Sequence, residues 1–596
     1  MNEDLRLMEA NEMKKISENY QYSEDGTLYY VTKKQDKSGF IYDEASAIAN
    51  HTPLLKEYRT IDDGFEQTDE LVFNALRNYH TGSDTILTLK HDIYSQTPSL
   101  KFGAACRIFL GKGAKARYSE AMQIQCEHIP HSTIYRHTGY TVVDGERVFL
   151  NGGYSINRDG LTDKYNVSLP EQMNSFKFIA EKDSDRYKTL LELFPKTACD
   201  DVIYASLGLV FLTPLNALLR AVGIEPRFIL YFTGKTGTRK TTLAKLLLNF
   251  FGTFDNGTAA PANFRDTIHA VEAKFAISDS TLMLLDDRIP STTPKLRVQM
   301  EAMEQAVARQ IGDRSGRSRM NADGTLKATY RPNCNLIITA EESFSNVGES
   351  AIARSLSVEL KPGYVNLDIL SEVQQKAEHL NQCMSEYIQW VIVNWDDISK
   401  KAQSLFSDLR PKAQSDGHGR LAECVAHLQM GIVFMCEWLR NEKVIDSENA
   451  EEVQNKAWDI FIKLAAAQNR RIFEEKPVKL FLDAVKAMMD RKAIRVEDAV
   501  TCPSMEFYAP MGYKDDNYYY FFPDAIYSEV RKFYSAQEKS FPLSRSALFQ
   551  QLADDGLIER DKTQNTKTKR LGDKRPRMLW IKREALEERE EFVNGE

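Results

Sequence analysis

The sequence predicts an α/β fold organised around a phosphate-binding loop, and three observations support this. An apolar strand at 228–232 runs into a glycine-containing loop and then into a helix that starts at Thr241. Some forty residues later, a short apolar run at 281–285 ends in two aspartates. The composition, 42% hydrophobic and 27% charged, is that of an ordinary globular protein.

The loop after the first strand has the residues that nucleotide phosphates require. Gly234 and Gly237 let backbone N–H groups point at phosphate oxygens, and the start of the following helix adds partial positive charge. Lys240 is expected to reach the β- and γ-phosphates, and the Thr241 hydroxyl to hold Mg²⁺. Arg239 stands where the usual pattern has glycine, and its role is open. The predicted nucleotide-binding set is Gly234, Lys235, Thr236, Gly237, Thr238, Arg239, Lys240, Thr241 and Thr242.

The two aspartates lie at the carboxyl end of their strand, the edge at which α/β sheets bind ligands. Asp286 is expected to bind Mg²⁺ through the threonine or a water, and Asp287 to polarise the attacking water. Most P-loop ATPases of this type have glutamate at the second place, so Asp287 is a shorter substitute. Together with the glycine loop, the two aspartates predict nucleotide hydrolysis.

Length, charge and cysteines limit the remaining possibilities. A chain of 596 residues implies roughly three to five domains. A net charge of −8 argues against a uniformly basic surface, so a nucleic-acid partner must be met by local patches. Eight cysteines without CxxC pairs favour reduced thiols and a cytoplasmic protein, and we expect no structural metal.

We expect neither a signal peptide nor a membrane span. The first fifteen residues are charged and lack the apolar stretch of a signal peptide. The run at 202–222 is long and apolar enough to suggest a membrane helix, but Pro214, Asn216 and Arg220 interrupt it. It is therefore expected to be a buried helix.

Local patterns predict five regions and several elements within them. In the second region, 71–79 has helical periodicity, 85–90 and 99–110 predict strands, and Asp144-Gly145 predicts a tight hairpin turn. The regions are an N-terminal region at 1–60, an α+β accessory domain at 61–194, an ATPase core at 195–365, a helical lid at 366–515 and a winged-helix domain at 516–596.

Two basic segments are candidates for nucleic-acid binding. A β-hairpin is predicted around 321–324, just before an apolar strand at 335–339, and its arms carry Arg314, Arg317, Arg319 and Lys327. A loop between the last two predicted strands is also basic, and only Asp573 opposes its charge locally. Binding to the phosphate backbone explains this loop at least as well as a solvated face does. Its basic residues are Lys562, Lys567, Lys569, Arg570, Lys574, Arg575 and Arg577.

These motifs together resemble the MCM-like AAA+ helicases of mobile genetic elements, including those of staphylococcal cassette chromosomes. The resemblance is carried by IYRHTGY and NGGYSI within 134–156, the loop GKTGTRKTT, the strand LMLLDD and the hairpin before NLIIT. It covers about 130–365, with the lid and the winged helix matching in outline. It implies an AAA+ core that uses ATP and Mg²⁺.

The resemblance also implies roles for residues outside the two phosphate-site motifs. Thr339, or the adjacent Glu341, corresponds to the polar sensor at the end of a strand. Arg354 corresponds to an arginine finger, on the far side of the core from its own loop. Arg420 corresponds to a second sensor at the start of a lid helix.

The implied function is an ATP-driven DNA helicase that moves on single-stranded and forked DNA as a homo-hexamer and replicates a mobile element. Arg317, Arg319 and Lys327 would grip single-stranded DNA in the central channel. Other replication proteins of the same element are candidate partners, and a membrane is not. Two alternatives stay open: a DNA-binding initiator or regulator that uses ATP as a switch, and a primase–helicase. The second requires a cluster of carboxylates before residue 190, and the aspartates there are dispersed.

Overall fold

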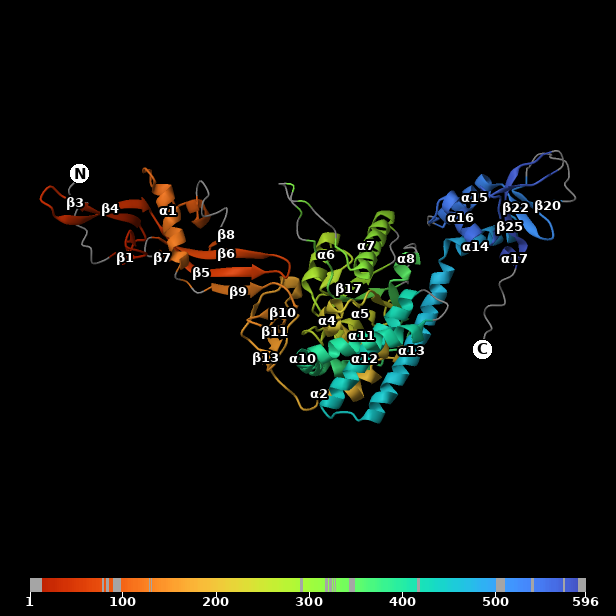
Figure 1. Ribbon diagram of the computed structural model, residues 1–596, viewed down its shortest axis with the longest axis horizontal. Helices are drawn as coiled ribbons and strands as arrows, with labels where there is room; N and C mark the ends of the chain where they lie inside the picture. The colour runs from red at the N-terminus through yellow and green to blue at the C-terminus, as the bar shows by residue number, and fades with distance from the viewer. Residues whose placement is uncertain are drawn as a thin grey trace.

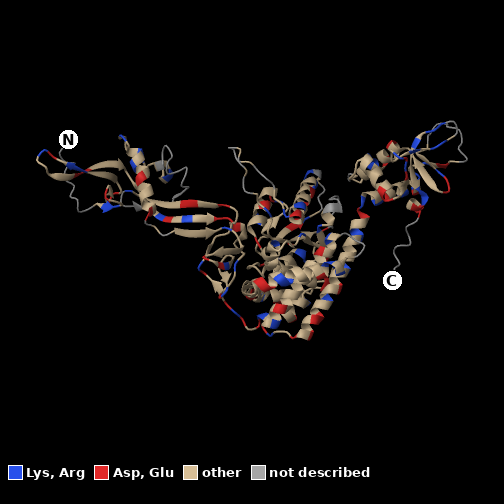
Figure 2. Cartoon of the chain, in the orientation of Figure 1, with Lys and Arg blue, Asp and Glu red and all other residues tan. Residues whose placement is uncertain are grey.

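The computed structural model describes residues 13–77, 80–81, 85–88, 98–127, 129, 131–289, 293–316, 320, 324, 326, 329–341, 349–414, 419–499, 510–537, 541–571 and 574–587. Three bodies follow one another along its longest axis (Figure 1). They are a β-rich N-terminal body, a central α/β body covered by helices, and a C-terminal domain. Acidic and basic residues are mixed along all three (Figure 2).

The N-terminal body contains two sheets and short helices. Its first sheet is formed by β1 (Lys14–Lys15), β2 (Tyr20–Tyr22), β3 (Leu28–Gln35) and β4 (Ile41–Ala49). The second sheet contains β5 (Thr52–Asp62), β6 (Gln67–Arg77), β7 (His80–Thr81), β8 (Thr85–Thr88), β9 (His131–Tyr135) and β14 (Asn166–Val167). The short helices are η1 (Pro98–Phe102), α1 (Ala114–Gln123) and η2 (Ile124–Glu127). Leu71 and Phe73 of β6 share a hydrophobic core with Tyr118 of α1.

Three expectations for this part of the chain differ from the structure. The boundary at 60/61 falls inside β5, which pairs with β6 from Thr52 to Asp62, so no domain ends there. The segment 71–77 is strand rather than helix. Residues 71–75 are all buried, and a continuous apolar run does not distinguish a strand buried on both faces from a helix. In the stretch 99–110, η1 and irregular backbone replace the expected strand.

A four-stranded meander follows, and it packs against the central body. It contains β10 (Gly139–Val143), β11 (Glu146–Leu150), β12 (Ser155–Asn157) and β13 (Gly160–Thr162). The predicted hairpin turn is confirmed: Asp144 and Gly145 both have positive φ, 53° and 83°, between β10 and β11. Phe149 of β11 is fully buried in the central core.

The centre of the molecule is a parallel five-stranded sheet in the order β16-β17-β18-β15-β19. Its strands are β15 (Ile229–Thr233), β16 (Ala262–Asn263), β17 (Leu282–Arg288), β18 (Asn335–Ala340) and β19 (Ser355–Glu359). Its helices are α5 (Lys240–Leu248), α6 (Ile268–Ile277), α7 (Pro294–Asp313) and α8 (Glu349–Ile352). Nearly every residue of β15, β17 and β18 is buried, as in a sheet covered on both faces.

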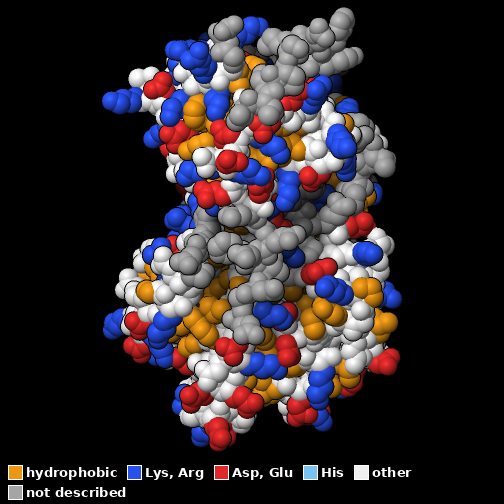
Figure 3. Space-filling view, turned by 90° about the vertical axis from the view of Figure 1, so that its right-hand side faces the viewer, with side chains coloured by type: hydrophobic (Ala, Val, Ile, Leu, Met, Phe, Trp, Pro, Cys, Tyr) orange, Lys and Arg blue, Asp and Glu red, His pale blue; other side chains and the backbone are white. Residues whose placement is uncertain are grey.

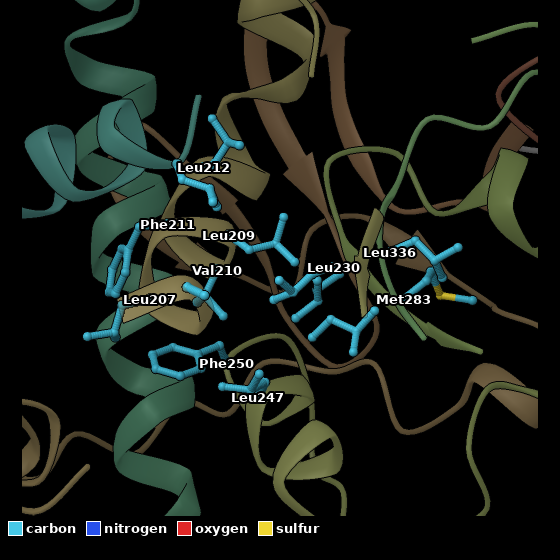
Figure 4. Close-up of a cluster of buried hydrophobic side chains, with 14 of the residues drawn as sticks. Leu207, Leu209, Val210, Phe211, Leu212, Leu230, Leu247, Phe250, Met283 and Leu336 are labelled. Atoms are coloured by element: carbon cyan, nitrogen blue, oxygen red, sulfur yellow. The ribbon is translucent and has the colours of Figure 1, made fainter. Parts of the chain in front are cut away.

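The apolar run at 202–222 lies inside this body, as expected. Residues 200–221 are long and apolar enough to cross a membrane, but 89% of an apolar 18-residue stretch within them is buried inside the protein. The run forms α3 (Asp200–Leu212), η6 (Thr213–Leu215) and α4 (Asn216–Ala221). Figure 4 shows Leu209 and Val210 of α3 beside Leu230 of β15, with Leu247 and Phe250 nearby.

A layer of long helices covers α3. The helices are α9 (Leu367–Gln375), α10 (Ala377–Val393), α11 (Trp395–Ala413), α12 (Gly419–Asn441) and α13 (Ser447–Glu474). The link from the meander contains η3 (Glu171–Met173), α2 (Arg186–Lys188), η4 (Thr189–Leu193) and η5 (Phe194–Lys196). Helices α3 and α12 meet at Gly208 and Gly431, where a side chain on Gly431 would collide with the carbonyl of Gly208. The expected lid is thus packed closely on the core.

The C-terminal domain has its own hydrophobic core. Its elements are α14 (Pro477–Asp490), β20 (Val496–Asp498), β21 (Gly512–Lys514), β22 (Tyr518–Phe521), α15 (Pro523–Ser535), α16 (Arg545–Asp554), β23 (Ile558–Glu559), β24 (Lys567–Thr568), β25 (Arg577–Lys582) and α17 (Arg583–Glu587). Phe481 and Val485 of α14 are fully buried with Phe521 and Ile581 of the sheet. The domain therefore begins near 477, and the boundary expected at 515/516 would cut through its core.

Candidate nucleotide-binding site

The glycine loop links the carboxyl end of β15 to the start of α5. Gly234 has φ 149°, and a side chain there would collide with the carbonyl oxygen of Leu360. Gly237 also has positive φ, 88°. Arg239 precedes α5 in the left-handed conformation, with φ 68° and ψ 23°. Arg239 thus keeps the backbone shape that glycine supplies in the usual pattern, at a cost of about 1 kcal/mol.

Lys240 lies within the loop at the first turn of α5. Its Nζ donates to the carbonyls of Gly234 at 2.5 Å and Lys235 at 3.0 Å. Burial lowers the pKa of Lys240, and the carboxylates of Glu341 and Asp286 oppose this. The ammonium therefore lies between the loop and the acidic end of the neighbouring strands.

Two threonine hydroxyls converge on one oxygen of Asp286. Thr241 Oγ1 donates to Asp286 Oδ1 at 2.8 Å, and Thr339 Oγ1 donates to the same oxygen at 2.5 Å. The backbone N–H of Asp287 donates to Thr339 Oγ1 at 3.2 Å. Residues from α5, β17 and β18 are thereby joined by hydrogen bonds, and the side chains that sequence reasoning assigned to the loop, the carboxylate and the sensor lie together.

Asp287 owes its direction to an irregularity in β17. The pairing of β17 with β18 shifts register between Leu285 and Arg288, and Asp287 has φ 70°. Such a bulge re-aims a side chain at the end of a strand. Asp287 is 40% exposed, and its Oδ2 lies 3.7 Å from Nη2 of Arg265, which is 76% exposed.

A cavity of about 240 Å³ lies at this carboxyl edge of the sheet. From β15 the chain crosses to β16 on one side of the sheet, and from β18 it crosses to β19 on the other side. The cavity therefore lies where the strand order reverses. Ligand sites in open α/β sheets occur at such points. It is lined by Thr236, Gly237, Arg239, Lys240, Thr241, Thr242, Asp287, Arg288, Ile289, Thr339, Ala340 and Glu341.

The residues present fit a nucleotide with Mg²⁺. The carbonyl of Leu360 leaves room only for glycine at position 234. The backbone of the glycine loop therefore lies close to the backbone that follows β19. A lysine, the N-terminus of α5 and the turn before it face phosphate-sized space. Mg²⁺ prefers one or two carboxylates together with hydroxyl and water oxygens, and Asp286 beside Thr241 meets that preference.

Sequence reasoning missed three residues near the site. Arg265 follows β16 and faces Asp287, but it belongs to no motif. Arg288 lies directly after Asp287 and is buried in an ion pair with Glu304 of α7 at 3.3 Å. The one sequence signal for Arg288 is its position as a charged residue at the end of an apolar strand. Nothing in the sequence of α7 distinguishes Glu304 from the other charged residues of that helix.

Arg354 and Arg420 lie at the amino ends of the strands, opposite the end that carries the glycine loop. Arg354 immediately precedes β19, and its carbonyl accepts from the N–H of Ile229, the first residue of β15. The glycine loop follows the other end of β15, about 16 Å away for five extended residues. Arg354 Nη2 lies 2.8 Å from Asp313 Oδ1, and Arg420 Nη2 lies 3.6 Å from the same atom. Neither arginine lines the cavity beside the glycine loop of its own chain.

The expected DNA-binding hairpin is only partly described. Arg317, Arg319 and Lys327 lie outside the described residues. Arg314, expected on a hairpin arm, instead ends α7 with φ 47° and is buried. Its guanidinium donates to the carbonyls of Pro226 at 2.8 Å and Cys334 at 2.7 Å. Arg314 is therefore a structural residue, because its guanidinium makes four hydrogen bonds to acceptors at the amino ends of β15 and β18.

The basic loop of the C-terminal domain has more acidic neighbours than its sequence indicated. Lys567 pairs with Glu559 at 3.2 Å, Lys569 with Asp515 at 2.9 Å, and Arg577 with Asp561 at 3.2 Å. Lys569 also lies 3.8 Å from the ring centre of Tyr520. Burial tends to raise the pKa of Asp515, but hydrogen bonds from Tyr520 and Lys569 lower it to about 2. On the face of this domain in the upper part of Figure 3, blue and red side chains are interspersed.

Comparisons with known proteins give the fold of the whole chain. No family profile matches the sequence, and no curated protein matches it. The solved structure titled "SCCmec type IV Cch - active helicase" matches 95% of this chain and 97% of its own, with a TM-score of 0.58 and 13% identity. The chain therefore has the fold of that helicase. An X-ray structure of JCV helicase matches 46% of this chain at a TM-score of 0.20 and 12% identity, too low to bear on the fold.

Proposed function

We propose that this protein is an ATP-dependent DNA helicase and that it hydrolyses ATP at the edge formed by β15, β17 and β18. The observation that carries the proposal is the shared oxygen of Asp286, to which Thr241 and Thr339 both donate beside the glycine loop. In the motif, the threonine and the aspartate together hold Mg²⁺, and here the two side chains already touch.

Each residue then has a chemical role. Lys240 and the N–H groups of the loop would stabilise negative charge on the β- and γ-phosphates. Thr241 and Asp286 would hold Mg²⁺, which supplies further charge neutralisation when bound. Asp287 would orient and polarise the attacking water, and Thr339 would keep the two aspartates in register through its hydroxyl. The AAA+ assignment is supported by the strand order with the loop at its reversal point.

The coupling of hydrolysis to DNA is supported by the fold rather than by the site. The likeness to a helicase runs over almost the full length of both chains, N-terminal and C-terminal domains included. We propose a homo-hexamer in which Mg-ATP is held between subunits, because Arg354 and Arg420 lie at the edge opposite their own loop. The basic residues 317, 319 and 327 and a C-terminal winged helix would contact DNA phosphates without reading sequence.

A strand-displacement assay tests the proposal against an ATP-driven switch. Duplexes with a 3′ tail, a 5′ tail or a fork are incubated with the full chain and Mg-ATP. A helicase separates at least one of them at a rate that requires hydrolysis, and Lys240→Ala abolishes both activities. ATP hydrolysis without displacement of any substrate would favour the initiator or regulator. ATP hydrolysis at the wild-type rate by Lys240→Ala would overturn the nucleotide site itself.

A further inference from the structure

The last two residues of α7, Gly312 and Asp313, contact arginines from two other elements, and we call these two residues the arginine seat. Arg354 lies across Gly312, where a Cβ atom would collide with Arg354 Cδ. Beyond Gly312, the guanidinium of Arg354 reaches both oxygens of Asp313, at 2.8 and 3.1 Å. Arg420, in the first turn of α12, reaches Asp313 Oδ1 at 3.6 Å. One carboxylate thus gathers two cations that are distant in the sequence.

Asp313 and Arg420 each carry a charge of the sign that its own helix end disfavours, so their interaction compensates both. Asp313 ends α7, where unpaired carbonyls carry partial negative charge that stabilises nearby cations. Arg420 begins α12, where partial positive charge works against it, so the interaction with Asp313 offsets an unfavourable position. The carboxylate compensates one of the two positive charges.

The seat is fixed to the sheet. Arg314, directly after Asp313, is buried and donates to the carbonyls of Pro226 and Cys334, just before β15 and β18. The side chain of Arg354 is only 10% exposed, whereas Asp313 is 42% exposed. The arginines are therefore held in a defined place beside solvent.

We propose that Gly312 and Asp313 are positioning residues that hold Arg354 and Arg420 ready for the γ-phosphate bound by a second copy of this chain. This rests on the proposed function, in which Arg354 completes a neighbour's site. Guanidinium groups bind phosphate oxygens in a fixed fork geometry, so an arginine held at the right place loses less freedom on binding. Asp313 itself touches no phosphate.

Two variants test the seat by different means. Asp313→Asn removes the charge and keeps the shape. Gly312→Ala keeps the charge and pushes Arg354 aside, and alanine is well tolerated within a helix. Each variant should lower the kcat for ATP at least tenfold with a smaller change in KM, because the interaction acts in the transition state. Glu372→Gln is the matched control, since Glu372 of α9 is also 42% exposed and pairs with Lys376, the residue that follows α9.

Mixed assemblies separate positioning from a fold defect. Asp313→Asn subunits retain Lys240, so mixing them with Lys240→Ala subunits should restore hydrolysis at interfaces that combine the two intact halves. Mixing Asp313→Asn with Arg354→Ala should restore nothing, because neither supplies a seated arginine. The proposal is overturned if both seat variants hydrolyse ATP like Glu372→Gln, or if co-assembled Asp313→Asn and Lys240→Ala hydrolyse ATP no faster than Asp313→Asn alone. Hydrolysis by Lys240→Ala alone would instead contradict the proposed function.

Discussion

Glu304 of α7 and Arg288 at the end of β17 form an ion pair that is almost completely shielded from water. Arg288 Nε lies 3.3 Å from Glu304 Oε2, and their side chains are 5% and 0% exposed. The hydroxyl of Tyr231 donates to the other carboxylate oxygen at 3.0 Å. Burial raises the pKa of Glu304, and Arg288 opposes this. Arg288 thereby links the end of β17 to α7, the helix whose last two residues contact Arg354 and Arg420.

Glu304→Ala should destabilise the central body by about 3–5 kcal/mol, because it leaves the Arg288 guanidinium buried without its carboxylate. Glu372→Ala, at an exposed pair, should cost less than about 1 kcal/mol. Urea unfolding followed through tryptophan fluorescence reports mainly on this body, because four of the five tryptophans belong to its core, namely Trp390, Trp395, Trp438 and Trp458. Equal midpoints for the two variants would show that the ion pair contributes nothing specific.

Thr339→Val should slow ATP hydrolysis by about 10–100-fold, the usual effect of losing a residue that orients metal ligands. The change removes one donor to Asp286 and the acceptor of the Asp287 N–H. Thr339→Ser keeps the hydroxyl and should retain most activity. Steady-state rates and the Kd for a fluorescent nucleotide distinguish orientation from binding. If valine and serine gave equal rates, the hydroxyl would have no role.

The geometry of the candidate nucleotide site was predictable because its two main motifs are each short runs of contiguous residues. A strand followed by a glycine loop, a lysine–threonine pair and a helix is typical of a phosphate-binding site. An aspartate pair at the end of a buried strand is also typical of such a site. Thr339 came from a resemblance rather than from a pattern, yet it bonds Asp286 directly. The left-handed conformation of Arg239 was not predictable, because the sequence only shows that glycine is missing.

The remaining differences arise where distant segments meet. Helix α14 looked like one more lid helix, since periodicity says which face is buried but not against what. The pairing of Lys569 with Asp515 joins residues 54 positions apart, so a count of local charge overstated how basic the loop is. The ion pairs of Asp313 with Arg354 and Arg420 were not predictable either, because these residues belong to separate elements that meet only in the folded chain.

Replacing Lys567, Lys569, Arg570, Lys574, Arg575 and Arg577 with glutamine should weaken DNA binding and flatten its dependence on salt by about one unit of slope per lost phosphate contact. ATP hydrolysis without DNA should persist. Single changes refine the test. Arg575 is exposed, so Arg575→Gln should cost close to one unit, whereas Lys569→Gln should cost less because Asp515 already pairs with it. An unchanged slope in the sixfold variant would mean that this loop does not touch DNA.

Arg354→Ala subunits mixed with Lys240→Ala subunits should recover ATP hydrolysis that neither variant has alone. Arg354 lies at the amino end of the sheet and Lys240 at the carboxyl end, so one chain cannot bring both to the same phosphate. In a ring, the loop of an Arg354→Ala subunit faces the arginine of a Lys240→Ala neighbour, and that interface is complete. The arginine stabilises charge on the transferring γ-phosphate and contributes about 10³-fold or more in related enzymes.

The measurement is ATP hydrolysis across a series of mixing ratios, with co-assembly checked by size and by pull-down of a tag carried by one variant. Activity should be greatest near equal proportions, because complete interfaces require unlike neighbours. Mixing either variant with itself at the same total concentration is the control. If the two variants demonstrably assemble together and no ratio recovers hydrolysis, Arg354 does not act on a neighbour. In that case the opposite-edge position of Arg354 and Arg420 would serve the stability of α7 and α12 alone.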